Sequence, residues 1–81
     1  MNTIAISYDL YRKSSGHYQR IIRCIRGNYQ YLAHQKSMWF IRTNESVDEV
    51  QRRLSSFIDT RDKLVVFEAN QGDVDRFLGL N

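Results

Sequence analysis

The stretch Thr3-Ile4-Ala5-Ile6-Ser7-Tyr8-Asp9-Leu10 alternates between bulky apolar residues and small or polar ones. Successive side chains of a β-strand point to opposite faces of a sheet, so this alternation predicts a strand with one apolar face. The other face carries Ala5, Ser7 and the carboxylate of Asp9. We expect the apolar face to be buried against helices.

The rest of the chain predicts two helices and three further strands. Within residues 17–27, apolar residues at i, i+3, i+4 and i+7 indicate a helix with one apolar side. Ser46 and Glu49 have the spacing of a capping box, which predicts that a second helix starts there. The expected strands cover residues 29–34, 37–43 and 63–69.

This order of elements predicts an α+β fold of the ferredoxin-like βαββαβ type, with both helices on one face of a four-stranded antiparallel sheet. At 81 residues, we expect a single domain with its core in residues 3–69. For residues 70–81, two alternatives stay open: a short helix that begins behind Asp73, or an extra strand.

The second face of the predicted sheet is expected to be apolar, because the strands at 37–43 and 63–69 carry bulky side chains on both faces. Monomers rarely expose a large apolar patch, so we expect a homodimer that packs sheet to sheet. The alternative cover is the chain's own tail. The expected interface residues are Ala5, Ser7, Ser37, Trp39, Ile41, Val65 and Phe67.

Basic residues are concentrated in the first half of the chain. Residues 1–42 contain seven basic side chains and one acidic one, whereas residues 43–81 contain five and eight. Such a basic half is typical of surfaces that bind phosphate backbones, and the alternative is an ordinary solvated surface. The candidate contacts to nucleic acid are Arg12, Lys13, Arg20, Arg23 and Arg26. Tyr11, Tyr29 and Tyr31 are candidates for stacking on bases, or for positions in the core or at its rim.

Several other classes of protein are not indicated. The single Cys24 excludes an internal disulfide, and no P-loop, dinucleotide fingerprint or zinc-ligand spacing is present in the sequence. The sequence has no run of 18 apolar residues and no signal-peptide pattern. We therefore expect a cytoplasmic protein that does not associate with membranes.

Asp9 has two interpretations. It caps or pairs with the loop that follows, or it lies near a two-fold axis and meets its symmetry copy. Two carboxylates brought together in this way can hold Mg²⁺ or Mn²⁺, which would orient a phosphodiester for hydrolysis. His17 is a candidate general acid or base near the same loop, and the alternative is a surface or capping residue.

The motifs Ile6-Ser7-Tyr8-Asp9-Leu10 and Gln35-Lys36-Ser37-Met38-Trp39-Phe40 resemble those of the small CRISPR-associated Cas-two proteins and the virulence-associated protein D group. The resemblance covers residues 3–69. It implies a ferredoxin-like homodimer in which Asp9 faces its counterpart as a metal-dependent nuclease residue, with Ser37 and Phe40 near the interface and in packing. The loop after Asp9 lacks the further acid and basic pattern expected of an adaptation protein, which favours a stand-alone relative.

Two functions follow as hypotheses. The first is a metal-dependent endonuclease that acts on RNA or DNA. The alternative is a non-catalytic dimer that binds nucleic acid or a protein, as a scaffold, a toxin–antitoxin component or a phage-encoded inhibitor.

Overall fold

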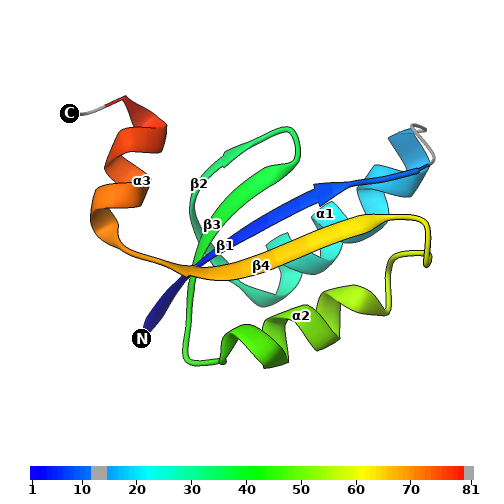
Figure 1. Cartoon of the computed structure of the whole chain (residues 1–81), viewed down its shortest axis with the longest axis horizontal. Helices are drawn as coiled ribbons and strands as arrows, with labels where there is room; N and C mark the ends of the chain where they lie inside the picture. The colour runs from blue at the N-terminus through cyan, green and yellow to red at the C-terminus, as the bar shows by residue number, and fades with distance from the viewer. Residues whose placement is uncertain (12–14, 80–81) are drawn as a thin grey trace.

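The computed structural model describes residues 1–11 and 15–79, and Figure 1 shows how the elements are arranged. No helix in these ranges has the length and apolar character that crossing a membrane requires. In chain order the elements are β1 (Asn2–Asp9), α1 (Ser15–Asn28), β2 (Gln30–Gln35), β3 (Met38–Thr43), α2 (Val47–Ser55), β4 (Lys63–Ala69) and α3 (Gln71–Leu78).

The four strands form one antiparallel sheet in the order β2-β3-β1-β4. β1 lies between β3 and β4, so that Ala5 is opposite Phe40 on one side and Phe67 on the other. The predicted α+β class with a four-stranded antiparallel sheet is confirmed. The strand order is compatible with a ferredoxin-like fold.

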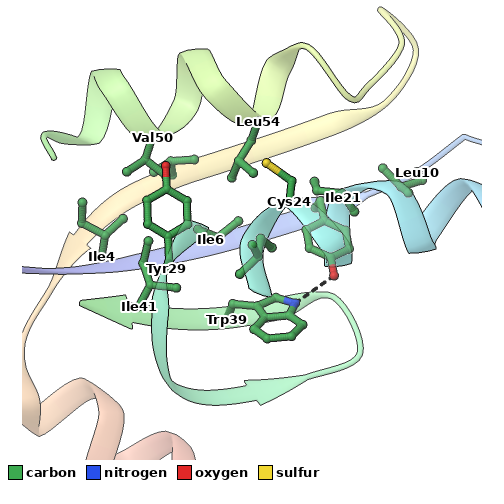
Figure 2. Packing of buried hydrophobic residues seen from close by; sticks show 13 residues of the cluster. Ile4, Ile6, Leu10, Ile21, Cys24, Tyr29, Trp39, Ile41, Val50 and Leu54 are labelled. Atoms are coloured by element: carbon green, nitrogen blue, oxygen red, sulfur yellow. Dashed lines mark hydrogen bonds between the residues drawn. The ribbon is translucent and has the colours of Figure 1, made fainter. Parts of the chain in front are cut away.

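The larger hydrophobic core joins the apolar residues of β1 to both α1 and α2 (Figure 2). Its fully buried members include Ile4 and Ile6 of β1, Ile21 and Ile25 of α1, and Val50 and Leu54 of α2. The alternation in β1 therefore predicted its buried face correctly. The capping box of α2 is also confirmed, because Ser46 Oγ accepts from the Glu49 amide while Glu49 Oε1 accepts from the Ser46 amide.

The tail forms a helix rather than an extra strand. Its N-cap is Asn70, whose Oδ1 accepts from the backbone N–H of Asp73 at 2.9 Å, while Asp73 Oδ2 accepts from the Asn70 N–H at 3.0 Å. The prediction of a helix behind Asp73 placed its start three residues too late, because Asn serves as an N-cap as well as Asp does. Gly79, with φ of 76°, ends the helix in a left-handed conformation.

α3 packs on the sheet through a second, smaller core. Val74 and Phe77 of α3 contact a cluster that contains Ala5, Ala33 and Phe40, and the rings of Phe40 and Phe77 lie 5.1 Å apart. These strand residues alternate with those of the larger core, so they lie on the other face of the sheet. The chain's own tail therefore covers part of the face assigned to a second subunit.

Two residues predicted for the dimer interface belong to the larger core instead. Trp39 and Ile41 are buried there. Val65 and Phe67 are paired with residues on the opposite face of β1, so they lie on the other face of the sheet. The prediction that these four residues share a face is wrong. Residues 38–41 are all bulky, so alternation could not show which of them point toward the helices.

The other predicted interface residues differ in how much of them is exposed. Ala5 is fully buried in the smaller core, and Ser7 and Ser37 are half-buried. Val65 is 55% exposed and Phe67 43% exposed. The uncovered apolar surface on this face is thus centred on β4, an edge strand of the sheet.

Candidate functional site

α1 presents three arginines, Arg20, Arg23 and Arg26, on its exposed side, as predicted. Its opposite side is buried through Ile21 and Ile25. Residues three apart rise about 4.5 Å along a helix, so the three side chains form a closely spaced row. Among the described residues, no carboxylate forms an ion pair or hydrogen bond with any of these guanidinium groups.

Three arginines in the second half of the chain do have carboxylate partners. Arg53 of α2 donates to Glu45 at 2.6 Å and to the Tyr29 hydroxyl at 3.0 Å, and that hydroxyl donates to Glu45 at 2.6 Å. The hydrogen bonds from Tyr29 and Arg53 hold the pKa of Glu45 below its ordinary value. The remaining pairs are Arg61 with Asp59 and Arg76 with Asp73.

Arg26 also belongs to a group of aromatic rings beside β2. Its guanidinium carbon lies 5.9 Å from the ring centre of Tyr31 and 6.0 Å from that of Trp39. His34 stacks on Trp39 with ring centres 4.4 Å apart, and Tyr31 meets both rings edge to face. Tyr31 is 42% exposed, so part of its ring is open to a ligand.

The two other tyrosines considered for stacking lie elsewhere. Tyr29 is buried in the larger core, and burial, followed by its hydrogen bond to Glu45, raises the pKa of its hydroxyl. Its interpretation as a stacking residue is therefore wrong. Tyr11 is 60% exposed, with the guanidinium carbon of Arg61 4.3 Å from its ring centre.

Asp9 lies exposed at the end of β1, opposite Lys63 of β4. With Tyr11, Arg61 and Lys63 it lines an open hollow of about 240 Å³. The predicted contacts Arg12 and Lys13 fall outside the described residues.

The described residues around Asp9 do not by themselves make a metal site. A Mg²⁺ or Mn²⁺ ion prefers several oxygen ligands, whereas the charged neighbours of Asp9 in this hollow are Arg61 and Lys63. Nowhere in the described ranges do three or more His, Cys, Asp or Glu side chains gather as a ligand set. A metal centre at Asp9 would need carboxylates from a second subunit.

The structure also pairs His17 with Asp62, which the sequence did not predict. His17 Nε2 lies 3.1 Å from Asp62 Oδ2, and the Asp62 side chain is fully buried. The same carboxylate accepts from the backbone amides of Tyr11 at 2.6 Å and Asp59 at 2.8 Å. This arrangement fixes the start of α1 to the turn before β4.

The hydrogen bonds that Asp62 accepts favour the ionised form of its carboxyl. Burial alone raises the pKa of this carboxyl, but the amides of Asp59 and Tyr11, together with His17, outweigh burial and hold it below its ordinary value. An open hollow of about 350 Å³ lies beside this pair, and its lining residues include His17, Arg20 and Asp59. The mixed charge of this hollow makes it a poorer anion site than the exposed side of α1.

Comparison with protein-family models finds no match for this chain, and no curated protein is found to be similar to it. The function must therefore be inferred from the contacts, burial and charges of the protein's own residues.

Proposed function

We propose that this protein binds nucleic acid and that the exposed side of α1 contacts the phosphate backbone. The observation that carries the proposal is the row formed by Arg20, Arg23 and Arg26, whose charges no described carboxylate neutralises. Arginine presents a planar fork of donors that matches phosphate oxygens, and it stays charged at any physiological pH.

Nucleic acid is favoured over a small anion because the row is open and extended. A single phosphate needs several donors that surround it. A nucleic-acid strand instead carries a phosphate at every nucleotide, and it releases counterions when arginines replace them. α1 contains three arginines and no acidic residue, so its exposed side also repels no phosphate.

The proposal is tested with a fluorescently labelled 20-nucleotide DNA at low salt. The variant R20Q/R23Q/R26Q should bind at least tenfold more weakly than wild type. R42Q/R52Q/R76Q is the matched control, because it loses the same net charge from other elements and should bind much as wild type does. Equal losses in both variants, or no binding by wild type, would contradict the proposal.

We also propose that the chain is a ferredoxin-like homodimer, a stand-alone relative of the Cas-two proteins. Exposed Val65 and Phe67 on β4 support this, because a second copy would cover the part of the sheet that α3 leaves open. V65K/F67K should halve the mass measured by light scattering, whereas L78K on α3 should not. A monomeric wild type at micromolar concentration would contradict the dimer.

A second candidate function is a metal-dependent endonuclease, which rests on the exposed carboxylate of Asp9 at the end of β1, beside Arg61 and Lys63. The two cations provide contacts for a phosphodiester next to a carboxylate. Because the described residues of one chain do not supply a ligand set for a metal, we make this activity depend on the proposed dimer. Cleavage of RNA or DNA that needs Mg²⁺ or Mn²⁺ and is lost in D9N would support it, and equal cleavage by D9N would exclude it.

A further inference from the structure

A hollow between α1 and the turn that joins β2 to β3 has the features of a base-binding pocket. Its volume is about 360 Å³, within the range of small-molecule sites. Tyr18 and Ile22 of α1 give it an apolar wall, while Gln19, Lys36 and Ser37 supply polar groups. None of the residues that line it is acidic.

The same side of α1 leads from this hollow to the aromatic group beside β2. Tyr18, Ile22 and Arg26 follow at i, i+4 and i+8, so they lie in one row over about 12 Å of helix. Arg26 at the end of the row contacts Tyr31 and Trp39. The hollow and the exposed ring of Tyr31 are therefore two parts of one surface, which we call the α1–hairpin groove.

The turn that borders the groove is held in place by the larger core. The indole N–H of Trp39 donates to the Tyr8 hydroxyl at 2.9 Å, the dashed bond in Figure 2, and that hydroxyl donates to the Lys36 carbonyl at 3.1 Å. The backbone N–H of Tyr8 also donates to the Ser37 carbonyl at 3.0 Å. A turn anchored at both residues is ready for a ligand with little loss of conformational entropy.

From these features we propose that the α1–hairpin groove binds single-stranded nucleic acid, with one base in the hollow and a neighbouring base against Tyr31. This inference rests on the proposed function and narrows it. Surfaces that bind single-stranded nucleic acid combine exposed aromatic rings with cations, because the unpaired bases have free faces that stack on the rings. In a duplex, the base faces are covered by neighbouring base pairs. An acidic peptide would bind through its charge, so the aromatic rings would add little to its affinity.

The test compares binding of a labelled twelve-nucleotide thymidine DNA and a twelve-base-pair duplex. Y31A should weaken binding of the single strand about tenfold and leave binding of the duplex unchanged. Y31F keeps the ring and should bind as wild type does. L78A, which truncates an exposed apolar side chain on α3, is the control. The single strand should also change the fluorescence of Trp39, the chain's one tryptophan.

Each outcome separates the groove from the basic side of α1. If Y31A binds the single strand as wild type does, or loses both ligands equally, the groove is excluded while salt-dependent binding still supports the proposed function. If a poly-glutamate peptide displaces the single strand as well as unlabelled DNA does, the groove binds acidic peptides instead. If wild type binds neither DNA, both proposals fail.

Discussion

α1 and α2 both bury an apolar stripe in the same core, but they differ in whether their charged side chains have partners of the opposite charge. The first turn of α2 contains Asp48 and Glu49, and its last turn contains Arg52 and Arg53, which is the distribution that the helix dipole favours. Arg53 is bound to Glu45, and Arg52 lines a hollow with two glutamates. α1 has no acid in its first turn, and its arginines lack carboxylate partners among the described residues.

The charges of α2 stabilise the fold, whereas most of the charges of α1 do not. The charges of α2 are explained by the fold itself, because they cap the helix, complement its dipole and join it to Tyr29 and Glu45. The charges at Arg20 and Arg23 do none of these things. The proposed binding of phosphates rests on the concentration of such charges along one exposed side of a helix, where their fields add.

Truncation of a core residue tests how tightly α1 and α2 pack in the larger core. Ile25 and Leu54 are both fully buried in the larger core, so I25A and L54A should each lower the free energy of unfolding by about 2–5 kcal/mol. Urea denaturation measures this. A cost below about 1 kcal/mol for either variant would show that its helix is not packed as described.

The hydrogen bonds of Asp62, which join the start of α1 to the turn before β4, should also contribute to the free energy of unfolding. Asp62 accepts two backbone amides, so D62N should cost about 1–3 kcal/mol of unfolding free energy at neutral pH. D48N makes the same chemical change at an exposed position in the first turn of α2; it is the control and should cost less.

The pH dependence follows from the lowered pKa of Asp62. Its contribution is fully present above the ordinary aspartate pKa of about 3.9 and is lost as pH falls through the lower folded-state value. The difference in stability between wild type and D62N should therefore shrink below about pH 4. A difference that stays constant from pH 7 to pH 2 would show that the charge of Asp62 contributes nothing.

The smallest effect separates the arginines of the two helices. R53Q removes the bonds to Glu45 and Tyr29, so its melting temperature should fall, but by less than that of D62N. R23Q removes no hydrogen bond or ion pair with the described residues and should melt as wild type does. Equal shifts in the two variants would remove the distinction between structural and ligand-binding arginines.

Local patterns in the sequence predicted the elements whose signals are local. The alternation of β1, the capping box at Ser46 and the apolar spacing of α1 each depend on neighbouring residues, and each was confirmed. The face of Trp39 was not predictable, because both faces of β3 are covered by elements distant in sequence. The docking of α3, which decides what covers Phe40, is one of these distant contacts.

The candidate site was predicted in part for the same reason. The arginines of α1 follow from helical spacing, so their exposure could be read from the sequence. The pair of His17 and Asp62 is separated by 45 residues, and the contact of Arg26 with Tyr31 needs α1 to lie beside β2. No local spacing could reveal either.

If the arginines on the exposed side of α1 bind phosphates, the affinity for nucleic acid must fall with salt concentration, and must fall less steeply once these arginines are removed. For a single strand, log Kobs falls with log salt by about 0.7 for each phosphate contact, so R20Q/R23Q/R26Q should reduce the wild-type slope by about 2. R42Q/R52Q/R76Q should leave the slope near that of wild type. An unchanged slope in the α1 variant, or the same reduction in the control, would contradict the account.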